Sequence, residues 1–163
     1  MQDIVNRLRA EKQDEGFTLI ELLVVVVIIG VLVAIAVPVY LNYREGAADK
    51  SAQSDVRGAI STIEQYYTDN GNKYPNNFSQ TNASAATATV TLTNRTGDPA
   101  PANVLKVTLS DKTTLGFVTT GTGTYKLCGK NGGGSNKTYL YDSSNGGSVG
   151  SPATAITNFA TCA

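Results

Sequence analysis

The sequence FTLIELLVVVVIIGVLVAIAVPVYL, residues 17–41, decides the architecture of this chain. Between residues 17 and 43 the only charged side chain is Glu21, and residues 22–41 are an uncharged run of 20. Twenty helical residues rise about 30 Å, which is the hydrocarbon thickness of a bilayer. A buried core helix or strand is the alternative, but core elements are usually shorter. The run therefore predicts a helix that spans a membrane.

Glu21 is the exception within this apolar segment. A carboxylate in a membrane helix costs about 2.5 to 3.5 kcal/mol at the centre and less near an end. Charged residues in such positions are usually kept for a function, so we expect Glu21 to have a specific partner.

The segment before the run sets the orientation of the chain. Residues 1–16 are polar and include Arg7, Arg9 and Lys12, which places the N-terminus in the cytoplasm and the remainder outside. An ordinary secretory signal is cut after its apolar segment, whereas this polar segment precedes the run. Export favours a disulfide between the two cysteines, Cys128 and Cys162. Free thiols in a reducing compartment are the alternative.

Composition excludes several function classes. The chain has 163 residues, zero formal net charge and no histidine, which argues against binding of nucleic acid by bulk charge and against most metal sites and histidine-activated nucleophiles. We expect no enzyme, no cofactor and no metal. Asp142 is the only carboxylate in DSSNGGS, residues 142–148, too few for a typical calcium site. Lys126, Lys130 and Lys137 are candidates for nucleic-acid contact, although a solvated face is the simpler interpretation.

The helical pattern continues beyond the apolar run. Apolar residues recur there at steps of three or four, which predicts an amphipathic helix: Ala48, Ala52, Val56, Ala59, Ile60, Ile63 and Tyr67. Asn70-Gly71 is its expected end, so residues 17 to about 69 form one helix nearly 80 Å long. Gly30, with Ala34, and Pro38 allow close packing or flexibility within the run. Both are also common in membrane helices without any such role.

The last part of the chain alternates polar and apolar residues in short segments between turns. These are 87–95, 104–110, 114–120, 124–130 and 137–143. Such alternation predicts an antiparallel sheet with one buried face. Because this sheet has few apolar residues of its own, we expect it to pack on the apolar stripe of the helix.

The segment GFTLIE, residues 16–21, followed by the apolar run, resembles the N-terminus of type IV pilins and their relatives. The resemblance covers about residues 16–45 and implies a pilin-like α+β fold. Its expected parts are a cleaved leader (1–16), a membrane or filament-core half-helix (17–43), an amphipathic half-helix (44–70) and a sheet head with a C-terminal disulfide loop (71–163).

The resemblance also implies processing and assembly. A prepilin peptidase would cut between Gly16 and Phe17, and the new amine of Phe17 would be methylated. An assembly machine in the cytoplasmic membrane would then polymerise identical subunits into a surface filament. Glu21, one helical turn from Phe17, is expected to pair with the amine of a neighbouring subunit and set the axial register. The alternatives are a pair within its own chain or a role in processing alone.

The resulting hypothesis is a structural, major subunit of a type IV pilus for adhesion, motility or DNA uptake. It would reside in the cytoplasmic membrane as a precursor and then on the cell surface. The alternatives are a pseudopilin of a type II secretion system, a class that often binds calcium and lacks the terminal disulfide, and a competence pilin that binds DNA. The leader departs from the pattern because it is longer and more acidic than many.

Overall fold

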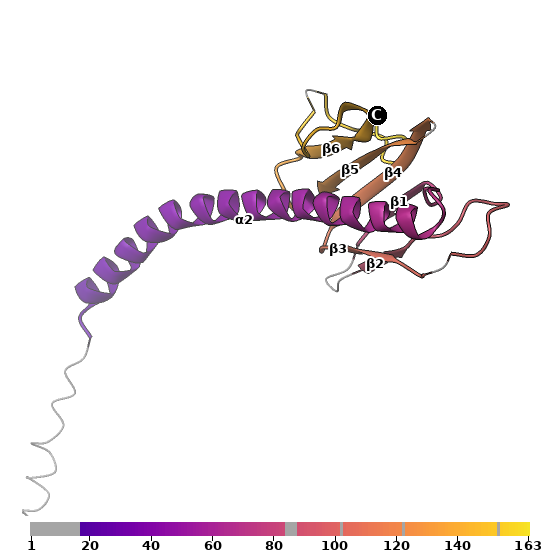
Figure 1. Ribbon diagram of the computed structural model, residues 1–163. Coiled ribbons are helices and arrows are strands. Elements are labelled where there is room, and N and C mark those ends of the chain that lie inside the picture. Colours follow the sequence, from indigo (N-terminus) through magenta and orange to yellow (C-terminus); the bar gives the residue numbers. More distant parts are fainter. Residues whose placement is uncertain (1–16, 84–87, 102, 122, 153) are drawn as a thin grey trace, which may run out of the picture. The chain divides into compact units, whose positions relative to one another are not determined.

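The computed structural model describes residues 17–83, 88–101, 103–121, 123–152 and 154–163 (Figure 1). It consists of two compact units, one ending at Tyr40 and the other comprising Leu41–Ala163. One helix, α2, runs from Leu19 to Asp69 and contributes to both units. This confirms the predicted long helix. The expected leader, with Gly16, lies outside the described residues.

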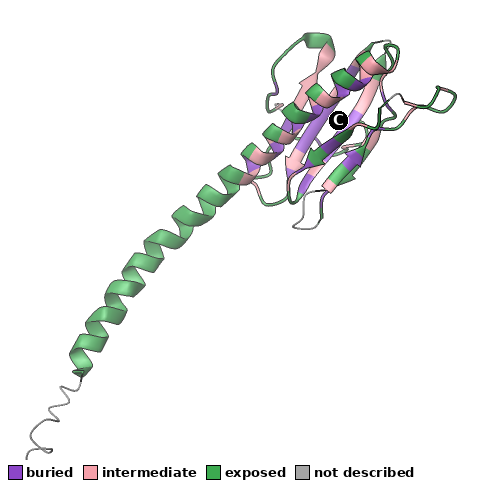
Figure 2. Cartoon of the chain, turned by 60° about the horizontal axis from the view of Figure 1, so that its bottom comes forward, coloured by how far each residue is buried: buried purple, intermediate pink, exposed green. Residues whose placement is uncertain are grey.

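The first part of α2 is apolar on every side, as expected of a helix that is surrounded by lipid or by other apolar helices. Every residue from 17 through 47 is exposed, and Figure 2 shows this stretch in uninterrupted green. Pro38 lies inside the helix. Among the described residues, α2 is the one helix long and apolar enough to cross a membrane.

The second unit places the rest of α2 against antiparallel strands (Figure 1). One sheet has the order β1-β4-β5-β6, formed by Phe78–Thr81, Thr113–Gly121, Thr124–Asn131 and Thr138–Asp142. A separate pair consists of β2 (Ala88–Thr91) and β3 (Lys106–Leu109). A short 3-10 helix, η1 (Ser143–Asn145), follows β6. The α+β fold class is confirmed, but the expected single sheet is two sheets, and β1 was not predicted.

The core forms where α2 meets the sheets. Its aromatic and aliphatic side chains come from the helix and from both sheets: Ala52, Val56, Ala59, Ile63, Tyr66, Val90, Leu92, Val107, Leu109, Leu115, Phe117, Tyr125, Leu127, Tyr139 and Val149. Gly129 of β5 allows the closest approach, since an added Cβ would lie 2.5 Å from Cγ2 of Val56. Helix and sheet are therefore packed backbone to side chain at this point.

The buried stripe of α2 differs at both ends from the predicted one. Asp49 and Tyr66 are buried, whereas Ala48 and Tyr67 are only half-buried. The steps between 49, 52, 56, 59, 63 and 66 remain three or four, so the period was right and the chosen face was slightly rotated. After Asp69, Gly71 has a φ of +64°, which confirms the predicted helix end at Asn70-Gly71.

Candidate functional site

The N-terminal end of α2 is closed by a reciprocal hydrogen-bond pattern. The Glu21 carboxylate accepts from the Thr18 N–H at 2.9 Å and from the Thr18 hydroxyl at 2.7 Å. In return, the Glu21 N–H donates to Oγ1 of Thr18 at 3.3 Å. This is a capping box, in which two otherwise unsatisfied donors of the first helical turn find partners. In the described chain Glu21 thus has an intrachain partner, and it faces the end of the helix where Phe17 lies.

The apolar part of α2 forms one continuous exposed surface beyond this cap. Phe17 is 81% exposed, and the large aliphatic residues that follow it are also exposed as far as Leu41. Exposed apolar patches of this extent mark surfaces that are covered by membrane or by protein. Gly30 has open space around its Cβ position, so a neighbouring helix could approach there. The structure thus presents the predicted assembly residues Phe17, Glu21 and Gly30 on one segment.

Three carboxylates in the second part of α2 attach the helix to the head. The buried Asp49 accepts from the Ser135 N–H at 3.1 Å and from the Ser135 hydroxyl. Asp55 accepts from the N–H and hydroxyl of Ser110 at 2.7 and 2.9 Å. Glu64 accepts from the Tyr125 hydroxyl at 2.7 Å.

Sequence reasoning missed these three contacts because the stripe was followed through apolar residues alone. Asp49 lies at the same three- and four-residue steps as Ala52 and Val56. Continuing the period through an acidic residue would have found it.

The aromatic residues beside Glu64 are shielded from water. Burial, together with the hydrogen bond to Glu64, raises the pKa of the Tyr125 hydroxyl. Burial, followed by the charge of Glu64, raises the pKa of Tyr74 to about 12. The rings of Tyr74 and Tyr125 lie with centroids 4.9 Å apart. Burial of these hydroxyls and the ring contact place Tyr74 and Tyr125 in one aromatic cluster.

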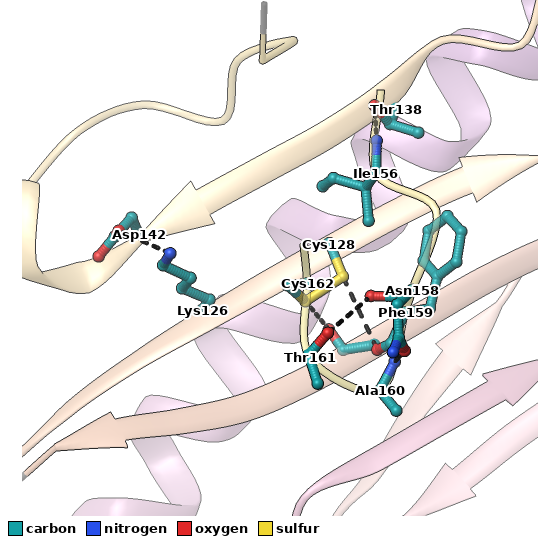
Figure 3. Close-up of a disulfide and its surroundings, with 11 residues drawn as sticks. Lys126, Cys128, Thr138, Asp142, Ile156, Asn158, Phe159, Ala160, Thr161 and Cys162 are labelled. Carbon is teal, nitrogen blue, oxygen red and sulfur yellow. Dashed lines mark hydrogen bonds and ion pairs between the residues drawn. A yellow bond between two sulfur atoms is a disulfide. The ribbon is translucent and has the colours of Figure 1, made fainter. Parts of the chain in front are cut away.

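The disulfide between Cys128 and Cys162, predicted from the sequence, is present across a separation of 34 residues (Figure 3). It holds the C-terminal segment over the face of the sheet that points away from α2, where Ile156 and Phe159 complete a second small cluster. Gly116 of β4 lies under this segment, because a Cβ there would overlap the carbonyl oxygen of Phe159. Both faces at the centre of the sheet are therefore covered, which corrects the prediction of a single buried face.

Three of the four residues considered for calcium or nucleic acid, namely Asp142, Lys126 and Lys137, have protein partners. The Asp142 carboxylate accepts from the N–H and hydroxyl of Ser144 at 3.0 and 2.6 Å, and these contacts lower its pKa. Lys126 lies 3.8 Å from the same carboxylate (Figure 3). Lys137 lies 4.0 Å from Asp49 of α2. Lys130 shares the outer side of β5 with Lys126, so two of the three lysines lie on one side of this strand while the third is paired with the helix.

Comparisons with known proteins match part of the chain. Residues 12–37 match the family described as "Prokaryotic N-terminal methylation motif". Over 65 residues the chain is 40% identical to type II secretion system core protein G of Dickeya chrysanthemi, which covers 40% of this chain and 42% of that protein. It is 41% identical over 63 residues to type IV major pilin protein PilE1 of Neisseria gonorrhoeae, covering 39% and 38%.

A fimbrial protein of Neisseria meningitidis serogroup B is 40% identical over 75 residues, which covers 46% of this chain and 41% of that protein. The chain thus spans about four tenths of the length of the curated relatives it matches. No solved structure matches it.

Proposed function

We propose that this chain, a member of the type IV pilin and pseudopilin family, is the major structural subunit of a type IV pilus. The observation that carries the proposal is the fully exposed apolar part of α2, from Phe17 to Leu41, joined to a separately packed head. A segment of this kind needs an apolar environment twice, first in the membrane and later among copies of itself. The neighbouring helices of a filament would supply the second environment.

Processing would create the N-terminus that assembly uses. Cleavage between Gly16 and Phe17 by a prepilin peptidase, followed by methylation of the Phe17 amine, leaves a cation one helical turn from Glu21. Within an apolar filament core, an amine and a carboxylate in contact reduce each other's cost of desolvation. The capping box keeps the Glu21 carboxylate at this end of the helix. We infer that it pairs with the amine of a neighbouring subunit and sets the axial register.

The second candidate is a pseudopilin of a type II secretion system, because core protein G of Dickeya chrysanthemi is as similar to this chain, over a stretch of about the same length, as PilE1 is. The Cys128–Cys162 disulfide and the engagement of Asp142 by Ser144 and Lys126 support the pilin instead. By the family resemblance, pseudopilins often bind calcium in their last loops and lack the terminal disulfide.

Isolation of surface filaments tests the proposal. Cells that express the chain should yield sheared filaments whose dominant subunit begins with N-methylated Phe17 by mass spectrometry. Deletion of the gene should abolish these filaments and leave bulk protein secretion unchanged. Loss of secretion with no long filaments in the parent strain would instead identify the pseudopilin.

The role of Glu21 is tested separately with Glu21→Ala, using Asp69→Ala on the same helix as the control. We expect processed Glu21→Ala subunits to remain in the membrane, while Asp69→Ala subunits assemble. Normal filaments from processed Glu21→Ala subunits would refute the pairing between neighbours.

A further inference from the structure

A charged groove lies where α2 enters the head. Its helix side is formed by Leu41, Arg44, Glu45 and Ala48, and its head side by the turn that carries Asp111 and Lys112. The cavity volume is about 370 Å³, which is within the range of roughly 300–1,000 Å³ typical of small-molecule sites. All of these residues belong to the second unit.

The groove follows directly on the uncharged run in the sequence, and this connection sets its depth while the subunit is in the membrane. Leu41 is the last residue of the uncharged run, and Arg44 follows it within one helical turn. Tyr40 and Tyr43 are exposed beside it, and tyrosines are enriched at the level of lipid headgroups. The first polar groups that this part of the chain meets outside the hydrocarbon are therefore phosphates and the groups attached to them.

The groove is lined by equal numbers of cationic and carboxylate side chains. Arg44 and Lys112 supply two cations, while Glu45 and Asp111 supply two carboxylates. A guanidinium and an ammonium group suit a phosphate, whereas carboxylates suit a primary ammonium that can donate hydrogen bonds. This arrangement complements a zwitterion in which a phosphate is linked to a primary amine.

The head side of the groove is held in place before any ligand arrives. Asp55 binds Ser110 at the start of the turn, and the Asn131 side chain donates to the Asp111 carbonyl at 2.8 Å. The Gly132 N–H donates to the Lys112 carbonyl at 2.8 Å. Groups that are fixed in advance lose little conformational freedom when they bind.

We propose that this groove binds the phosphoethanolamine headgroup of an outer-leaflet phospholipid while the subunit waits in the membrane. The phosphate lies between Arg44 and Lys112, and the primary ammonium lies toward Glu45 and Asp111. The proposal rests on the membrane-resident stage of the proposed function. Release of this lipid is then a step that accompanies extraction of the subunit into the filament.

Native mass spectrometry of the full chain, released from micelles doped with one lipid at a time, tests the proposal. We expect one phosphatidylethanolamine to bind about tenfold more tightly than phosphatidylcholine, whose quaternary ammonium cannot donate hydrogen bonds. The Arg44→Gln/Lys112→Gln variant should lose this binding. The Glu45→Gln/Asp111→Asn variant should lose only the preference for ethanolamine over choline.

The matched control is Lys126→Gln/Lys130→Gln, which removes two cations from the outer side of β5 and should bind lipid as the parent does. Circular dichroism of the tyrosines checks that each variant keeps a folded head.

The proposal would be overturned if phosphatidylglycerol bound as tightly as phosphatidylethanolamine or more tightly. It would also be overturned if the control variant lost lipid binding as much as the Arg44→Gln/Lys112→Gln variant does. Amide shifts at Gly132 and Gly133 that follow protein concentration rather than lipid would assign the groove to a second copy of the chain. If surface filaments with methylated Phe17 form but ethanolamine lipids are not selected, only the lipid site fails.

Discussion

Removal of the Cys128–Cys162 cross-link is expected to destabilise the head strongly. The bond closes a loop of 34 residues, and for this separation the chain-entropy relation gives about 4 kcal/mol. Folded domains are stable by only about 5–15 kcal/mol, so this is a large share of the total. The loss should begin in the C-terminal segment, because Ile156 and Phe159 pack in the small cluster that is built around the disulfide.

Urea unfolding of the full chain in detergent micelles measures this effect. The chain has eight tyrosines and no tryptophan, and the buried Tyr66 and Tyr125 report the folded head through near-ultraviolet circular dichroism. With a slope of about 2 kcal/mol per molar urea, the Cys128→Ala/Cys162→Ala variant should unfold about 2 M earlier. The parent under reducing conditions, which keeps both sulfur atoms, separates the cross-link from packing. A reduced parent that unfolds at the oxidised midpoint would refute the reasoning.

Three further perturbations follow from the contacts of the head. Asp49→Ala leaves the donors of Ser135 without their acceptor and should lower the free energy of unfolding by about 1.5–3 kcal/mol in urea titrations. Gly129→Ala forces a Cβ into the side chain of Val56 and should lower the free energy of unfolding by about 1–3 kcal/mol. The double variant Gly129→Ala/Val56→Ala should regain part of this loss. An unchanged urea midpoint for Gly129→Ala would contradict the close packing. The pKa of Tyr74 is raised from 10 to about 12 in the folded chain. The neutral Tyr74 hydroxyl therefore makes its full contribution to the free energy of unfolding below pH 10, and this contribution is lost as the pH rises toward 12. Ultraviolet titration of the tyrosines in the folded and the unfolded chain should show this difference in pKa.

The sequence contains strong local signals for the helix and weak ones for the sheets. The three- and four-residue period predicted a helix to about residue 69, and α2 ends at Asp69. Strand β1, with the sequence FSQT, has a single apolar residue, Phe78, so alternation could not mark it. Its position depends on antiparallel pairing with β4, which is distant in sequence. The division into two sheets is likewise a property of long-range pairing.

The functional residues also differ in how well the sequence alone could predict them. Glu21 was predicted to be functional because its charge is unusual in an apolar segment, and the spacing of Thr18 and Glu21 also encodes the observed capping box. Asp49 gave only a weak signal, its place in the three- and four-residue period of the stripe, because an acidic residue in an amphipathic helix normally faces solvent. Its burial becomes intelligible only once Ser135, 86 residues away, is seen to donate to it.

The carboxylates of α2 also determine how force would reach the head during the proposed assembly. Within the described chain, Leu41–Asp69 is the connection between the apolar part of α2 and the sheets. Apolar contacts made by small residues are not directional and resist sliding weakly. The hydrogen bonds that Ser135 and Ser110, in two different loops, donate to Asp49 and Asp55 are directional, and a shift by one turn would break both. Because a shielded carboxylate that loses its hydrogen-bond donors is costly, the contacts of the buried Asp49 and the half-buried Asp55 fix the register of the helix on the head. A subunit pulled by its apolar end should therefore leave the membrane with its head attached and folded.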